Sequence, residues 1–231
     1  AHVPAFGADN DDPGNATLVT NPTKSWAFYD TIEAGGAAYY EATYLAGERL
    51  SVTLYSPSRD LTPSLVVLTP DGEPAEGVPA AVEVPEGYGA TVVEGERAAA
   101  AEFEPFTPGA YYYSVSVDRP VETAGTYLIA VYAEGDRAGP VGLAIGRTES
   151  FTPVEYLTVP IDVLAVHAWE GDSPALVFGP GVVVALGGVA VLWRRLGQPA
   201  SRRSRSSRGN RLARWALGLA GVAILATTAM L

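Results

Sequence analysis

The sequence predicts a mainly β protein, in which an antiparallel β-sandwich or jelly roll precedes a transmembrane hairpin of two helices. Two observations predict this fold class. Between residues 25 and 150, short runs rich in Val, Tyr, Leu and Thr alternate with turn signals such as Pro70-Asp71-Gly72, a pattern typical of antiparallel all-β domains. After Ser173, two uncharged apolar runs flank an arginine-rich segment, which is typical of two membrane spans joined on the cytoplasmic side.

Nine strands are expected in the extracytoplasmic sandwich of residues 25–150, because short runs there are rich in Val, Tyr, Leu and Thr, and several of them alternate apolar and polar side chains with period two. They cover residues 26–32, 38–44, 50–55, 64–68, 81–84, 91–93, 110–117, 126–132 and 141–145. In the run 111–117, strict alternation assigns four side chains to one face of the sheet, namely Tyr111, Tyr113, Val115 and Val117. The acidic insertion 72–106 is expected to be largely solvated, with a functional loop as the alternative.

The segments on either side of the sandwich differ from it in composition. Residues 1–24 are rich in Asp, Asn, Pro and Gly and are expected to form an extended entry segment. In the juxtamembrane segment 151–173, Pro160 suits a first helical turn. Behind it an apolar stripe follows at helical spacing, namely Ile161, Leu164, Ala165 and Ala168. We therefore expect a helix over residues 160–169 on the outer membrane surface; one more strand or a core helix of the domain is the alternative.

The predicted hairpin consists of a first span at residues 174–194, a loop at 195–213 and a second span at 214–231. Its two uncharged runs contain 19 and 17 residues, close to the roughly 20 that cross the hydrocarbon as a helix. Arginines between them orient the loop toward the cytoplasm, namely Arg194, Arg195, Arg202, Arg203, Arg205, Arg208, Arg211 and Arg214. The preceding domain is then expected outside the plasma membrane, with the lipid bilayer as its first partner.

Charge is distributed unevenly along the chain. All 26 acidic residues lie at or before Asp172, whereas only seven of the 15 basic residues lie before Arg194. The predicted outer part therefore carries a net charge of −19, which repels nucleic acids and excludes them as partners. The chain has no cysteine, so its outer domain folds without disulfides. Its single lysine and many acids indicate a high-GC organism, such as a salt-adapted archaeon.

Three stretches share the same strand-and-turn pattern. A tyrosine-bearing strand enters a Gly-containing turn and an alternating strand at 38–52, a Pro-Asp-Gly turn closes the stretch 63–72, and a third strand follows at 125–131. Through them, about half of the chain resembles the pre-peptidase C-terminal domain of bacteria and archaea, a small β-sandwich. The resemblance implies a binding or spacing module.

Three further stretches carry a second resemblance. They are His2-Val3-Pro4 at the start of the chain, residues 21–26 and residues 166–171. These stretches resemble an uncharacterised group of archaeal surface proteins with C-terminal membrane spans. The resemblance implies a membrane-bound surface protein and names no activity.

Catalytic motifs are absent from the sequence. It contains no Cys nucleophile, Gly-x-Ser-x-Gly elbow, His-Glu-x-x-His, P-loop or dinucleotide fingerprint. A hydrolytic triad would have to use one of only two histidines, His2 or His167. We therefore expect a non-catalytic protein without a cofactor, and a cell-surface enzyme is the least favoured alternative.

Metal binding remains an alternative at two places. If processing exposed His2 as the first residue, its amine and imidazole could chelate copper, with His167 as a second imidazole. The carboxylates of Asp9, Asp11 and Asp12, together with Asn10, could gather Ca²⁺ through oxygen ligands, although their spacing departs from the EF-hand loop. The competing interpretations are a docked or frayed N-terminus and a solvated acidic turn.

Surface recognition is the remaining candidate role. A tyrosine platform for a partner or glycan is one hypothesis, and core packing is the other; the platform would consist of Tyr39, Tyr40, Tyr111, Tyr112 and Tyr113. Asn15 begins an Asn-Ala-Thr glycosylation acceptor. The sequence thus predicts a membrane-anchored binding or interaction module, or an accessory subunit of a membrane complex, with a copper-binding surface protein as the alternative.

Overall fold

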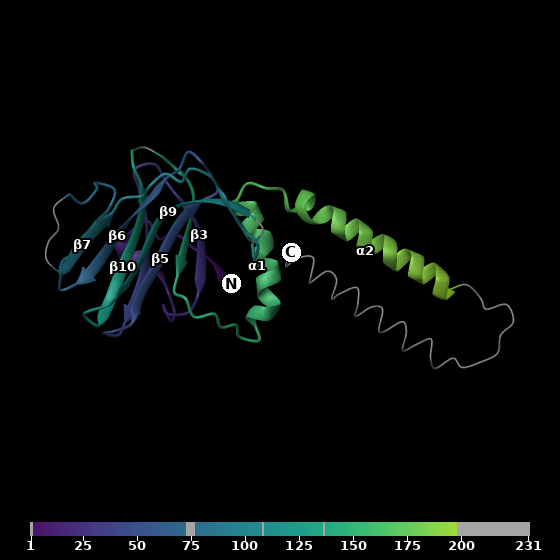
Figure 1. The fold of residues 1–231 in the computed structure, drawn as a ribbon, viewed down its shortest axis with the longest axis horizontal. Coiled ribbons are helices and arrows are strands. Elements are labelled where there is room, and N and C mark those ends of the chain that lie inside the picture. The colour runs from purple at the N-terminus through teal and green to yellow at the C-terminus, as the bar shows by residue number, and fades with distance from the viewer. Residues whose placement is uncertain (1, 73–76, 108, 136, 198–231) are drawn as a thin grey trace. The chain divides into compact units, whose positions relative to one another are not determined.

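The computed structural model describes residues 2–72, 77–107, 109–135 and 137–197, and the chain divides into the units Ala1–Glu170 and Gly171–Leu231. The first unit contains two β-sheets and one α-helix, α1 (Figure 1). The expected mainly β class is confirmed. Each unit is described by itself below.

One sheet has six strands in the order β1-β3-β11-β5-β9-β8. In chain order these are β1 (Val3–Phe6), β3 (Trp26–Ile32), β5 (Arg49–Ser56), β8 (Glu102–Glu104), β9 (Gly109–Pro120) and β11 (Gly139–Ile145). The edge strand β1 pairs with β3 in parallel, and the other pairs are antiparallel. The predicted entry segment thus contributes an edge strand of this sheet.

The second sheet has five strands in the order β2-β4-β10-β6-β7. They are β2 (Thr17–Leu18), β4 (Ala37–Tyr44), β6 (Pro63–Pro70), β7 (Tyr88–Val93) and β10 (Gly125–Ala133). Eight of the nine predicted strands are present in the two sheets within a few residues of their expected bounds, and the structure adds β1, β2 and β8. The short 3₁₀ helix Pro13–Asn15 precedes β2.

The predicted strand at 81–84 is wrong. This stretch is irregular and packs against the outer face of the five-stranded sheet, where Val82 is buried. The backbone N–H of Glu83 donates to the hydroxyl of Tyr39 over 2.7 Å. Part of the insertion 72–106 therefore covers a sheet face, contrary to the expectation of a mostly solvated segment.

The main core lies between the two sheets. Alternate side chains of both sheets meet there, among them Val52, Leu54, Leu65, Val67, Ile129, Val131, Leu143 and Ile145. The rings of Phe28 and Tyr40 lie 5.2 Å apart within it. Strand β5 shows the expected alternation, since Val52 and Leu54 point into this core and Thr53 points to the outer face, whereas β6 and β10 are buried on both faces.

Strand β9 departs from strict alternation at Ser114. Its pairing with β5 skips this residue, which marks a β-bulge. Because a shift of one residue exchanges the two faces of a strand, Tyr111 and Tyr113 pack on the outer face of the sheet, whereas Val115 and Val117 pack in the core. The prediction that these four side chains share a face is therefore wrong.

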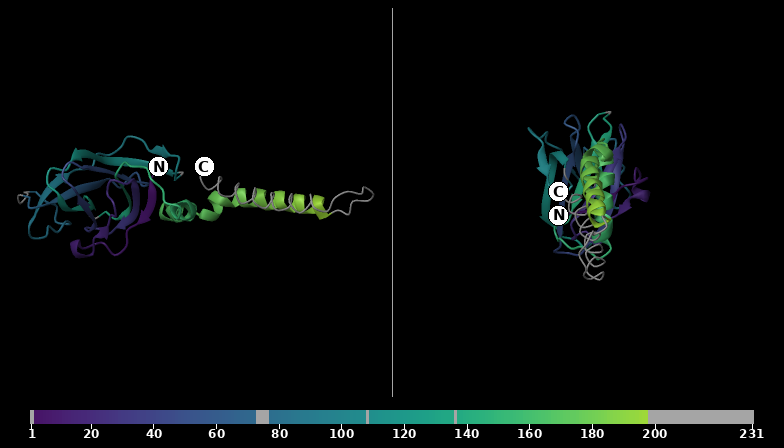
Figure 2. Two further views of the ribbon diagram at one scale, coloured as in Figure 1. Left: turned by 90° about the horizontal axis from the view of Figure 1, so that it is seen from below. Right: turned by 90° about the vertical axis from the view of Figure 1, so that its right-hand side faces the viewer.

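Helix α1 (Glu155–Trp169) packs against β1 and β3 on the outside of the six-stranded sheet (Figure 2). It begins five residues earlier than the predicted helix, and its buried side chains are Val159, Val163, Val166 and His167. The apolar stripe seen in the sequence lies on the opposite, exposed side, with Ile161 66% exposed. The helix is thus apolar on two faces.

The second unit contains helix α2 (Pro174–Gly197), which spans the predicted first membrane segment. In the described part of the chain, no helix is identified as long and apolar enough to cross a membrane. Of the orienting arginines, Arg194 and Arg195 belong to α2. The second predicted span and most of the loop lie outside the described residues, together with Arg202, Arg203, Arg205, Arg208, Arg211 and Arg214.

Candidate binding site

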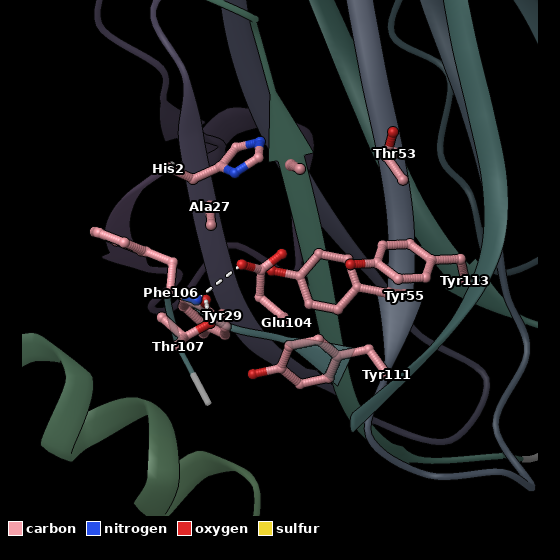
Figure 3. A pocket seen from close by; sticks show the side chains of 11 residues that line it. His2, Ala27, Tyr29, Thr53, Tyr55, Glu104, Phe106, Thr107, Tyr111 and Tyr113 are labelled. Carbon is pink, nitrogen blue, oxygen red and sulfur yellow. Dashed lines mark hydrogen bonds between the residues drawn. The ribbon is translucent and has the colours of Figure 1, made fainter. Parts of the chain in front are cut away.

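A cavity of about 160 Å³ opens on the outer face of the six-stranded sheet (Figure 3). It is bounded by four tyrosines, a histidine and a glutamate together with small and hydroxylated side chains. The lining consists of His2, Ala27, Tyr29, Thr53, Tyr55, Glu104, Phe106, Thr107, Tyr111, Tyr113 and Ala144. Every one of these residues belongs to the first unit.

The floor of the cavity is a row of small side chains across three neighbouring strands. Ala144 on β11 lies opposite Ala27 on β3 and opposite Thr53 on β5. All three point to the outer face, because their neighbours along each strand point into the core. The sheet is therefore hollowed where these small residues meet.

The next row along the same strands carries the aromatic wall. Gly142 lies opposite both Tyr29 and Tyr55, and Tyr55 lies opposite Tyr113. A Cβ on Gly142 would overlap the ring of Tyr55. The absence of a side chain at this position thus allows the Tyr55 ring to lie over the strand, where it is 5.5 Å from the Tyr113 ring and 4.9 Å from that of Tyr111.

The opposite wall comes from β8 and the turn after it. The carboxylate of Glu104 accepts a hydrogen bond from the backbone N–H of Phe106 over 3.0 Å (Figure 3). In the same turn, the buried Thr107 hydroxyl accepts one from Tyr29 over 3.3 Å. His2, which directly precedes β1, completes the lining. The half-buried residues of this wall leave the cavity accessible from solvent.

The cavity lining contains one carboxylate, that of Glu104, and its other side chains are uncharged. Burial lowers the pKa of His2, the positive charge of the N-terminal amine lowers it further, and Glu104 and Glu149 have smaller opposing effects, so the imidazole is neutral at neutral pH. Burial raises the pKa of the Tyr29, Tyr55 and Tyr111 hydroxyls, and raises that of Tyr113 to about 12. No Lys or Arg is part of the lining.

Helix α1 is fastened beside the cavity by a buried polar cluster. The carboxylate of Glu170 accepts from the Tyr111 hydroxyl and lies 2.9 Å from Nδ1 of His167. Gly109 leaves room for this contact, since a Cβ there would overlap Glu170. The Trp169 indole donates to the carbonyl oxygen of Asp30 over 2.6 Å. Tyr111, which lines the cavity, therefore connects it directly to the helix.

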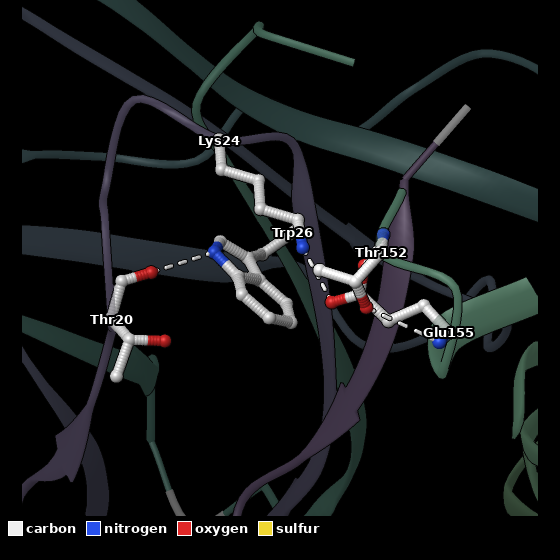
Figure 4. Close-up of polar contacts among 5 residues, drawn as sticks. All are labelled: Thr20, Lys24, Trp26, Thr152 and Glu155. Carbon is white, nitrogen blue, oxygen red and sulfur yellow. Dashed lines mark hydrogen bonds and ion pairs between the residues drawn. The ribbon is translucent and has the colours of Figure 1, made fainter. Parts of the chain in front are cut away.

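A second fastening lies at the start of α1 (Figure 4). Lys24, which is 7% exposed, forms an ion pair with Glu155, and its Nζ lies 4.4 Å from the Trp26 ring centroid. Glu155 and Thr152 form a capping box, in which each side chain accepts from the other residue's backbone N–H over 2.7 and 3.3 Å. The only lysine of the chain is thus committed to holding the helix.

The proposed tyrosine platform is split between different environments. Tyr39 packs on the outside of the five-stranded sheet and Tyr40 in the core, where each is at most 1% exposed. Tyr111 and Tyr113 line the cavity, whereas Tyr112 does not. The five residues therefore do not form one surface.

The two histidines lie in different parts of the first unit. His2 lines the cavity, while His167 is buried on α1 and does not. Within the described residues, no cluster of three metal-ligating side chains includes His2 or the aspartates at positions 9, 11 and 12. Asp12 instead caps the 3₁₀ helix through the N–H of Gly14 over 2.6 Å.

Two further residues complete the account of the predicted sites. Asn15 is exposed at the end of the 3₁₀ helix, where a glycan could be attached. Asn10 is buried, and its amide donates to Asp30 over 3.0 Å. The acidic turn around Asn10 is therefore anchored to the sandwich.

Sequence reasoning missed several residues of the cavity, including Tyr29, Tyr55, Glu104 and Thr107. The alternation in β3 and β5 marks Tyr29 and Tyr55 as outward-facing, but it does not show that a helix covers that face. An uninterrupted alternation in β9 also placed Tyr111 and Tyr113 on the same face as Val115 and Val117, which lie in the core. The run of small residues opposite one another becomes visible only once strand order is known.

A scan against protein-family models and a search of curated proteins both found no match. Among solved structures, the chain is similar to the Yersinia pseudotuberculosis-derived mitogen (YPM), with 12% sequence identity and a TM-score of 0.32. The similarity covers 57% of this chain and 92% of that chain. A likeness this weak carries no argument about function.

Proposed function

We propose that this chain is a membrane-anchored extracytoplasmic β-sandwich that acts as a non-catalytic binding module, alone or as an accessory subunit of a membrane complex. The observation that carries the membrane attachment is the two-faced helix α1. One face, with Val159, Val163 and Val166, is buried against the sandwich. The other exposes Leu157 and Ile161, which are 75% and 66% exposed. A lipid surface is a suitable environment for that second apolar stripe.

The chain after α1 supports the same proposal. In α2, apolar side chains are exposed at the consecutive positions 182, 183 and 184 and again at 186, so the apolar surface goes all the way around the helix. The segment that follows carries eight arginines and no acid between residues 194 and 214. By the positive-inside rule, this arrangement would keep the loop in the cytoplasm and the sandwich outside.

The cavity supports a binding role. It offers aromatic rings, hydroxyls and a single carboxylate, groups that fix and orient a ligand in a largely apolar pocket. The resemblance to pre-peptidase C-terminal domains is consistent with a module of this kind. The fastening of α1 would hold the cavity at a defined position above the membrane surface.

Cysteine labelling in intact cells tests the orientation, because the chain has no cysteine of its own. A membrane-impermeant maleimide should label Ala46→Cys, at an exposed turn of the sandwich, in intact cells. It should label Ser206→Cys in the arginine-rich segment only after the membrane is opened. Labelling of Ser206→Cys in intact cells, or protection of Ala46→Cys, would contradict the proposal.

The lipid contact of α1 is tested separately with an environment-sensitive fluorophore. The probe is attached to Ile161→Cys, and the full chain is transferred from a maltoside detergent into lipid vesicles that carry a quencher in the lipid headgroups. The emission of the probe should then shift to shorter wavelength, and the quencher should reduce its intensity. The same probe on Ala46→Cys is the matched control and should do neither. Equal behaviour of the two positions would exclude a membrane-facing stripe.

A further inference from the structure

We propose that the cavity on the six-stranded sheet binds a small organic cation with an alkylated ammonium group, such as the trimethylammonium group of choline. This inference rests on the proposed binding function and assigns a ligand class to it. It follows from the aromatic wall, the charge of the lining, the volume of the cavity and the apolar surface that the lining offers.

The aromatic wall favours a cation. Four tyrosine rings line the cavity, and the Tyr55 ring lies between two of the others, 4.9 Å from Tyr111 and 5.5 Å from Tyr113. The face of an aromatic ring is electron-rich and attracts a cation placed over it. Their hydroxyls stay protonated, because burial raises each pKa, so the rings act as neutral π-systems.

The charges around the cavity also favour a cationic ligand. Glu104 is the one acidic residue of the lining, the imidazole of His2 is neutral because its pKa is lowered, and the lining contains no Lys or Arg. The chain up to Asp172 carries a net charge of −19. The field therefore attracts cations and repels anions, which argues against a phosphate or carboxylate ligand.

The volume limits the size of the ligand. About 160 Å³ is close to the ~150 Å³ of an engineered cavity that holds benzene. It is well below the roughly 300–1,000 Å³ of pockets for drug-sized ligands. A trimethylammonium group fits these dimensions, whereas a glycan chain, one of the ligands expected from the tyrosines, does not.

The apolar part of the lining favours an alkylated ammonium over a primary one. A primary ammonium carries three donors, each of which needs an acceptor once it is desolvated. Methyl groups need no acceptor, and they make apolar contacts with the rings of Tyr55 and Tyr113 and with Ala144.

Isothermal titration with choline tests the proposal on the full chain purified in a maltoside detergent. Choline should bind at one site. Its uncharged isostere 3,3-dimethyl-1-butanol should bind at least about tenfold more weakly, since it lacks the charge that the rings and Glu104 attract. Absence of choline binding, or equal affinity for the two compounds, would overturn the assignment.

Three variants locate the binding to the cavity. Glu104→Gln and Tyr113→Ala should each weaken choline binding about tenfold, while Tyr113→Phe should keep the affinity because it keeps the ring. Tyr112→Ala, on the same strand but outside the lining, is the matched control and should bind choline normally. Unchanged affinity in Glu104→Gln and Tyr113→Ala, with unaltered circular dichroism, would place any choline site elsewhere.

Two sources could supply the same group, a soluble solute or a choline lipid. Reconstitution in phosphatidylcholine vesicles should abolish binding of added choline if the headgroup occupies the cavity, whereas phosphatidylglycerol vesicles should not. Retained binding in both vesicle types assigns the site to a soluble cation. Since the titration does not depend on membrane orientation, its failure and the failure of the cysteine-labelling experiment are distinguishable.

Discussion

Two identical substitutions on strand β4 should have opposite effects on stability. Tyr40 and Tyr44 are both completely buried, and Tyr→Phe removes one hydroxyl from each without changing the packing of the ring. The Tyr40 hydroxyl donates to Oδ2 of Asp30 over 2.8 Å. The Tyr44 hydroxyl has no hydrogen-bond partner among the described residues. The same chemical change therefore breaks a hydrogen bond at one position and removes a buried unsatisfied group at the other.

The expected magnitudes follow from these contacts. A hydrogen bond to a charged acceptor contributes about 1.5–3 kcal/mol. In Tyr40→Phe, Asp30 loses this donor and keeps the amide of Asn10 at 3.0 Å and the backbone N–H of Thr31 at 2.7 Å. Tyr44→Phe deletes an unsatisfied buried hydroxyl and should raise the free energy of unfolding by about 1 kcal/mol. For a domain of this size, 1 kcal/mol corresponds to roughly 2–4 °C in Tm.

Thermal unfolding of the full chain, followed by circular dichroism, measures both effects. Tyr40→Phe should lower Tm by roughly 3–12 °C, and Tyr44→Phe should raise it by roughly 2–4 °C. The T-shaped contact of Tyr44 with Tyr127, at 5.7 Å between centroids, survives the substitution. A Tyr44→Phe variant as destabilised as Tyr40→Phe would refute the assignment of these two hydroxyls.

Three further predictions concern α1 and the aromatic wall. Burial raises the pKa of Glu155, but hydrogen bonds from Lys24 and Thr152 outweigh this effect and leave it below its ordinary 4.5. The ion pair therefore stabilises α1 above that pH and is lost as pH falls through the lowered pKa. The protection factors of the α1 amides, which compare each exchange rate with its intrinsic rate at the same pH, should fall on acidification, and less so in Glu155→Gln. Thr152→Ala removes one of the two hydrogen bonds of the capping box and should lower the free energy of unfolding, measured by chemical denaturation, by about 1 kcal/mol. An unchanged free energy would mean that the cap does not stabilise the helix. Gly142→Val overlaps the Tyr55 ring and should cost about 1–3 kcal/mol in urea; a neutral result would mean that this ring is not held in place.

The sequence predicts the sandwich because its strands alternate and its turns carry strong signals. Strands β3, β4 and β10 begin and end within one residue of their expected bounds, since each is a run rich in apolar and aromatic residues that is bounded by a turn signal. Strands β1, β2 and β8 were not predicted. They have two to four residues and depend on pairing with a longer neighbour, which local composition does not reveal.

The candidate site could not be predicted for a related reason. The face of β9 that carries Tyr111 and Tyr113 is decided by the bulge at Ser114, and that bulge is stabilised by contacts distant in sequence. The Ser114 hydroxyl donates to the carbonyl oxygen of Pro63 over 2.6 Å, and its own carbonyl accepts from Glu96 over 2.9 Å. Alternation describes a strand only as far as its first bulge.

Helix α1 shows why an apolar stripe does not identify the face that is buried. The sequence presents Ile161, Leu164, Ala165 and Ala168 at helical spacing, yet the structure buries the valines at 159, 163 and 166 and leaves that stripe exposed. Both faces are apolar, so hydrophobicity alone cannot choose between them. The choice is made by polar groups at the helix ends, where Lys24 holds Glu155, and Tyr111 and Asp30 hold the residues 169 and 170. Because these contacts fix the rotation of the helix about its axis, they also determine that the second stripe faces away from the sandwich, where it is available to a membrane surface.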